Sequence, residues 1–192
     1  MNNLTLDGRS SVSGGTYEGV DVDGLSKING DLTCDKADID GVCKVRGNVR
    51  VQGRVRADGV WKIYGNLDAE DIDVEGVLSV FGDATAESAK IEGALKVEGT
   101  FNVGQLDLKF FNAPKIKEIV GGKIHIRNGT RRRHFKAELI EGDEVLVQRA
   151  KVKVVRGDNV VIGAGCTVDR VEYRSRLDVH PKAVVKEKVE LN

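Results

Sequence analysis

The sequence predicts an all-β fold, a triangular β-helix (β-solenoid) built from coils of about 17 residues. Two glycine series predict it, because they recur in phase at 24, 41, 59, 76 and 93 and, six residues later, at 30, 47, 65, 82 and 99. Apolar residues also alternate between the glycines, as in Leu67/Ala69 followed by Ile72/Val74, which is the period-two pattern of strands. Three short strands fill each repeat, so the predicted path is triangular.

The repeats form successive coils that close with an apolar residue, an acid and a glycine. The regular coils span 24–40, 41–58, 59–75, 76–92 and 93–109, and the stretch 8–23 fits with one residue missing. Stacked coils place equivalent residues in columns about 4.8 Å apart. We expect two buried columns, Ile28, Val45, Ile63, Val80 and Val97, and Leu32, Val49, Leu67, Ala84 and Phe101.

The repeat changes after Lys109, which divides the chain into three predicted parts. Residues 1–109 are regular solenoid coils, 110–137 are an irregular coil with a basic, hairpin-like insertion, and 138–192 are further, less regular coils. Asn128-Gly129 is a good tight-turn pair within the middle part. A separate C-terminal module is the alternative to one elaborated solenoid.

Composition and charge narrow the function classes. Lys plus Arg and Asp plus Glu both number 30, so no global charge argues for nucleic acid or an acidic membrane. No stretch approaches the length of a transmembrane helix and no signal-peptide pattern opens the chain, so we expect a cytoplasmic protein. The three cysteines lack CxxC spacing and are expected to be reduced thiols.

The coils, followed by KEIVGGKIHIRNG, LIEGDEVLV, VRGDNVVIGAGCTVDRVEY and AVVKE, resemble the bactofilins, in particular their two-part relatives in Gram-positive bacteria. The resemblance covers nearly the whole chain. It implies a right-handed winding, end-to-end polymerisation without nucleotide, and a role as a scaffold for cell-shape or envelope proteins. Membrane association would then come through those partners.

The ends of a solenoid supply a physical reason to polymerise. An exposed strand edge recruits further strands unless charge, proline or a cap blunts it. Neither Pro nor Lys occurs in the first eight residues, and Leu4 and Leu6 already occupy repeat positions. We therefore predict a polymer-end edge at Leu4 and Leu6.

An enzyme is the main alternative, because hexapeptide-repeat acyltransferases use coils of similar length and residues 160–168 could pass for such a repeat. Those trimeric enzymes generally need histidines as bases or metal ligands. His125, His134 and His180 have no recognisable ligand spacing, and no GxSxG elbow or Walker loop occurs. We predict no catalytic, cofactor-binding or metal-binding residues, and read 163–165 as a solenoid corner.

Three surface features are candidates for contacts. Arg127, Arg131, Arg132, Arg133 and Lys136 form a concentrated basic patch that could hold a protein or lipid partner, with nucleic acid unlikely. A monomeric adaptor that binds through this basic loop is the second alternative function.

The other two candidates lie along the regular coils. Tyr64 and Phe81 occupy equivalent outward positions and are a candidate lateral contact. The charged columns Asp40, Asp58, Glu75 and Glu92, and Lys27, Lys44, Lys62 and Lys96, fit solvated faces or a side-by-side filament register. The function predicted from the sequence is a non-enzymatic, self-polymerising cytoskeletal scaffold whose main partner is itself.

Overall fold

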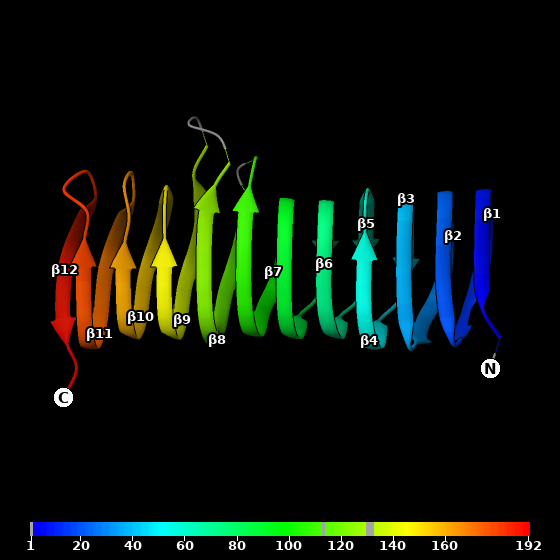
Figure 1. Ribbon diagram of the computed structural model, residues 1–192, viewed down its shortest axis with the longest axis horizontal. Coiled ribbons are helices and arrows are strands. Elements are labelled where there is room, and N and C mark those ends of the chain that lie inside the picture. Colours follow the sequence, from blue (N-terminus) through cyan, green and yellow to red (C-terminus); the bar gives the residue numbers. More distant parts are fainter. Residues whose placement is uncertain (1, 113, 130–132) are drawn as a thin grey trace.

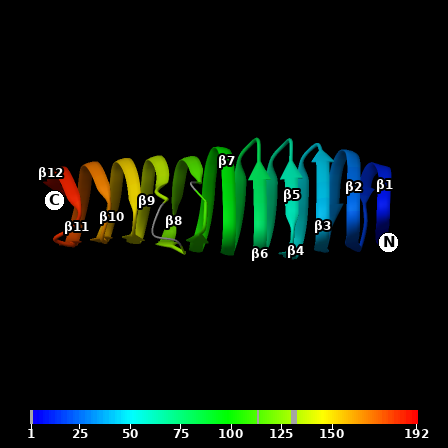
Figure 2. The same cartoon turned by 90° about the horizontal axis from the view of Figure 1, so that it is seen from above.

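The computed structural model describes residues 2–112, 114–129 and 133–192, and it confirms the all-β solenoid. One sheet of parallel strands winds into about 11 turns, and the two chain ends lie at opposite ends of a rod (Figures 1 and 2). Its strands are β1 (Leu4–Thr16), β2 (Gly19–Cys34), β3 (Lys36–Arg46), β4 (Val49–Ala57), β5 (Val60–Ile63), β6 (Leu67–Val80), β7 (Ala84–Phe110), β8 (Lys115–Asn128), β9 (Phe135–Val147), β10 (Ala150–Ile162), β11 (Thr167–Val179) and β12 (Val184–Glu190).

The strand register confirms the coil register expected from the glycines. Val45 pairs with Ile28 on one side and with Ile63 on the other, so this column is continuous through β2, β3 and β5. The missing residue of the first coil appears as an irregularity between Ser13 and Gly15 in the pairing of β1 with β2. Both predicted inward columns are buried throughout.

The core runs the length of the rod because every coil contributes inward side chains to it. Trp61, Phe101, Phe110 and Phe135 are its largest fully buried side chains. The position shared by Cys43 and Trp61, whose facing could not be decided from the sequence, points inward, since both side chains are inaccessible to solvent. Burial of each coil depends on its neighbours, as in other repeat proteins.

The polar residue that follows the second glycine of each coil does more than favour a turn. The side-chain Oδ1 of Asn48 accepts a hydrogen bond from the backbone N of Asn66 at 2.9 Å, and Asn66 Oδ1 accepts from Asp83 N at 2.9 Å. Asp31 and Asp83 serve the next coils in the same way, at 2.7 and 2.8 Å. This amide ladder joins the five regular coils, from 24–40 to 93–109, to one another at one corner.

Beyond Lys109 the sheet continues without a break, so residues 138–192 belong to the same solenoid as the first coils. Lys115 pairs with Lys136, 21 residues later, whereas Phe135 pairs with Ala150, only 15 residues later. One long coil is thus followed by one short coil. The strands that flank the basic segment, β8 and β9, pair in parallel and so do not form a β-hairpin with each other, while residues 130–132 lie outside the described residues.

Candidate interaction surfaces

The two ends of the rod expose strand edges. Each of β1 and β12 pairs with one neighbour, β2 and β11, and no other described strand bonds to their outer edges. At the β1 edge, Leu6 is buried and Leu4 is half-buried. At the β12 edge, Val184 is 57% exposed, and Leu177, Val179, Ala183 and Val185 are only partly buried. Apolar side chains are therefore well exposed at the β12 end, whereas at the β1 end Leu4 is only partly exposed.

Tyr64 and Phe81 are brought together as the repeat predicts. Their rings stack with centroids 4.9 Å apart and planes inclined by 6°, and Tyr64 is 51% exposed. Lys96 Nζ lies 4.6 Å from the centroid of the Phe81 ring, within the range of a cation–π contact. The stacked pair forms a small aromatic surface on the side of the rod.

The predicted basic patch does not form one cluster in the part of the chain that is described. Arg127 Nη2 donates to both carboxylate oxygens of Asp107 at 2.7 Å, and this carboxylate raises the pKa of Arg127. The backbone oxygen of Arg133 accepts a hydrogen bond from Asn128 Nδ2. Lys136 lies in a different column from Arg127, and Arg131 and Arg132 lie outside the described residues.

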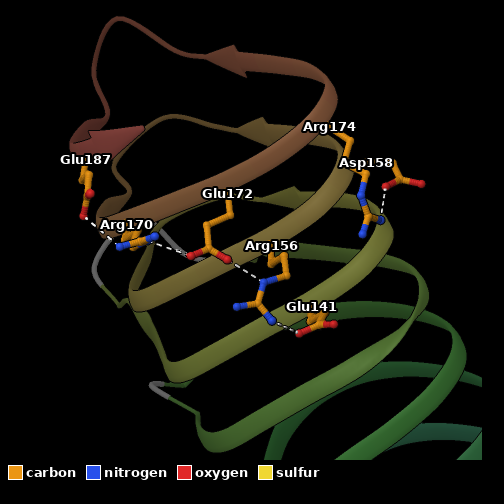
Figure 3. A network of polar contacts seen from close by, with 7 residues as sticks. All are labelled: Glu141, Arg156, Asp158, Arg170, Glu172, Arg174 and Glu187. Carbon is orange, nitrogen blue, oxygen red and sulfur yellow. Dashed lines mark hydrogen bonds and ion pairs between the residues drawn. The ribbon is translucent and has the colours of Figure 1, made fainter. Parts of the chain in front are cut away.

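A network of ion pairs crosses the last coils and was not foreseen from the sequence (Figure 3). Arg156 bonds Glu141 at 2.8 Å and Glu172 at 2.5 Å, and Arg170 Nε bonds Glu172 at 2.7 Å. The two guanidinium groups lower the pKa of Glu172, whose side chain is only 9% exposed. Because Glu141, Arg156 and Glu172 are aligned in successive coils, this network ties β9, β10 and β11 together.

Residues with catalytic potential are buried or scattered. Burial raises the pKa of Cys34 to about 11 and of Cys43 to about 12, and it also raises the pKa of Cys166. His180 Nδ1 accepts a hydrogen bond from the backbone N of Lys182. Among the described residues, no three His, Cys, Asp or Glu side chains group as a metal site would require, and no helix could span a membrane.

Comparison with known proteins finds relatives but no described activity. The chain is 34% identical over 99 residues to the uncharacterized protein YhbF of Bacillus subtilis (strain 168), covering 48% of this chain and 42% of YhbF. It is 42% identical over 55 residues to the uncharacterized protein YhbE of the same organism, covering 29% of this chain and 23% of YhbE. The chain thus spans less than half the length of either relative. No family model and no solved structure matches it.

Proposed function

We propose that this protein is a non-enzymatic scaffold that polymerises end to end without nucleotide and organises cell-shape or envelope proteins. The observation that carries the proposal is the pair of open edges at β1 and β12, where unpaired backbone groups lie beside core side chains. The resemblance of the repeats to the bactofilins supports the same function.

End-to-end contact would satisfy both kinds of exposed group at once. An added strand pairs the free N–H and C=O groups of an edge, and edge-to-edge recruitment is the ordinary consequence of leaving such an edge open. Burying the apolar side chains of the terminal coils adds a hydrophobic contribution of roughly 25 cal/mol per Å² of apolar area. A solenoid needs no nucleotide for this, because the contact repeats the one that already joins its own coils.

Electron microscopy of the purified protein without nucleotide tests the proposal. We expect filaments from the wild type and short, unjoined rods from Leu4→Lys, which places a charge at the terminal coil of the core. Thr85→Lys is the matched control, because Thr85 is exposed and lies in β7, in the middle of the rod and away from both edges, so this variant should still form filaments.

Two other outcomes would overturn the proposal. A uniform trimer that turns over acyl-CoA would indicate a hexapeptide-type transferase. A monomer that binds a partner in a salt-sensitive manner through its basic loop would indicate an adaptor.

A further inference from the structure

A single column of lysines follows the rod far beyond the regular coils. The strand register aligns one outward position along the rod from Ser11 to Val184. In the eight successive coils from Lys27 to Lys151, lysine occupies it in seven, with Ser79 as the exception. This lysine ladder consists of Lys27, Lys44, Lys62, Lys96, Lys115, Lys136 and Lys151. Its members are about 4.8 Å apart from coil to coil, the spacing of neighbouring strands.

A column of acids runs parallel to the lysine ladder. Six successive coils carry an acid four residues before the position of the lysine ladder. In the first coil, Ser11 occupies that position. This acid ladder consists of Asp7, Asp23, Asp40, Asp58, Glu75 and Glu92. Both ladders share the period of the same sheet, so they match in spacing over any number of coils.

Most residues of both ladders form no ion pair with the described residues. Lys96 pairs with Glu98, but the other six lysines form no ion pair with any residue in the described ranges. In the acid ladder, Asp58 pairs with Arg56 and Glu92 with Lys109, whereas the other four acids have no such partner among the described residues. Like charges on adjacent strands destabilise a sheet. The alternating Glu141, Arg156 and Glu172 column shows the opposite arrangement within the same molecule.

Apolar side chains lie beside these charges. An outward column midway between the two ladders is formed by Leu25, Val42, Val60, Val77 and Ala94. Of the four large hydrophobic side chains that are exposed among the described residues, Leu25 belongs to this column and Tyr64 lies on the far side of the lysine ladder. Covering this apolar surface with a second molecule would therefore be energetically favourable.

We propose that the lysine ladder of one copy binds the acid ladder of a second copy, side by side with their long axes aligned. A second copy presents acids at the spacing of the lysines along the whole ladder, and the contact relieves the repulsion within both ladders. A lipid surface would neutralise the lysines but would repel the nearby acid ladder. This inference rests on the proposed scaffold and adds a lateral contact to it.

The two ladders flank one apolar column, so two copies that face each other about a two-fold axis parallel to their rods pair both ladders at once and cover that column. Filaments should therefore associate in pairs, and high salt should separate them, because screening weakens exposed ion pairs.

A charge-exchange experiment tests the inference. The lysine-reversed variant carries Glu at Lys27, Lys44, Lys62 and Lys96, and the acid-reversed variant carries Lys at Asp23, Asp40, Asp58 and Glu75. We expect each variant alone to associate laterally at least about tenfold more weakly than wild type, because like charges then oppose each other. Mixing the two should restore association, because opposite charges face each other again at both contacts.

Sedimentation in the Leu4→Lys background measures lateral association apart from end-to-end growth, and the width of the filaments in micrographs measures it in assembled protein. The charge-matched control carries Glu at Lys36, Arg50, Lys90 and Arg133, four exposed cations outside both ladders and away from the terminal strands, and should associate as wild type does. If a reversed variant loses its circular dichroism signal, Gln at the same four lysines gives the test without reversal.

The failures of the two proposals are distinguishable. Single filaments whose width and sedimentation ignore ladder reversal would overturn the lateral contact and leave end-to-end assembly standing. Lateral association without filaments would overturn the scaffold proposal instead. If the lysine-reversed variant associates normally but no longer binds phosphatidylglycerol vesicles, the ladder is a lipid contact and the inference is wrong.

Discussion

Replacing Gly76 with alanine should disturb the joint between two coils. Gly76 has φ of +150°, a backbone conformation that residues with a side chain rarely adopt. An added Cβ would also lie 2.2 Å from the carbonyl oxygen of Gly59. Ordinary contact begins at 3.4 Å, so the coils would have to separate locally by about 1.2 Å. The same carbonyl accepts a hydrogen bond from Val77 N at 2.7 Å, which that movement would break.

The two effects can be added to give a magnitude. Backbone strain costs about 1–3 kcal/mol and the lost hydrogen bond about 0.5–1.5 kcal/mol, so Gly76→Ala should lower the free energy of unfolding by about 1.5–4.5 kcal/mol. At roughly 2–4 °C per kcal/mol for a chain of this size, a loss of about 3 kcal/mol lowers the melting temperature by about 6–12 °C. Thermal melting by circular dichroism measures the shift, and hydrogen exchange at the Val77 amide localises it.

Gly30→Ala separates the two effects. Gly30 has φ of +107°, but the nearest atom to its added Cβ is Gly14 N at 3.7 Å, so only backbone strain should act there. We therefore expect a smaller loss of stability than at Gly76. Wild-type melting of Gly76→Ala, or a larger effect at Gly30, would mean that the coils are not stacked as described.

Three further predictions concern the coils and their thiols. Asn66→Ala removes the acceptor for the backbone N of Asp83 and should cost about 0.5–1.5 kcal/mol, whereas Asn66→Asp keeps an acceptor oxygen and should cost less; equal urea midpoints would contradict the amide ladder. Glu172→Gln should lower the free energy of unfolding by about 1–3 kcal/mol at pH 7, because it weakens the charge-assisted hydrogen bonds from Arg156 and Arg170. Since the pKa of Glu172 is lowered on folding, its contribution to stability is complete above the unfolded pKa of about 4.3 and is lost as pH falls through the folded pKa. The melting temperatures of variant and wild type should therefore converge in acid, and a difference that does not change with pH would refute this. A thiol reagent at pH 8 should label no cysteine in the native protein and all three after unfolding, and rapid native labelling would contradict the buried thiols, Cys34, Cys43 and Cys166.

The sequence was sufficient for the first coils because their spacing is nearly constant. Ile28, Val45 and Ile63 could be aligned by counting residues, and the structure aligns them in the same way. Beyond Lys109 the spacing between paired residues varies from 15 to 21, which hides equivalent positions from any fixed count. For this reason Lys115, Lys136 and Lys151 were not recognised as continuing the lysine column.

Other parts of the candidate surfaces depend on side-chain geometry that a repeat does not encode. The pairing of Arg127 with Asp107 joins β8 to β7 across 20 residues, and it removes one cation from the predicted basic patch. The position of Glu172 between two guanidinium groups likewise depends on the register of the short coils. The stacking of Tyr64 on Phe81 could be predicted, because both lie in regular coils.

Each regular coil adds the same rise, so the number of coils sets the length of the rod in fixed steps. Removing residues 59–75, which form one coil, would join Asp58 to Gly76 and preserve the order of acid, glycine and apolar residue at the junction. The rod would shorten by about 4.8 Å, and the columns above and below the deletion would still line up. Length can therefore change in whole steps, by gain or loss of coils, without altering the chemistry of either end or of the sides.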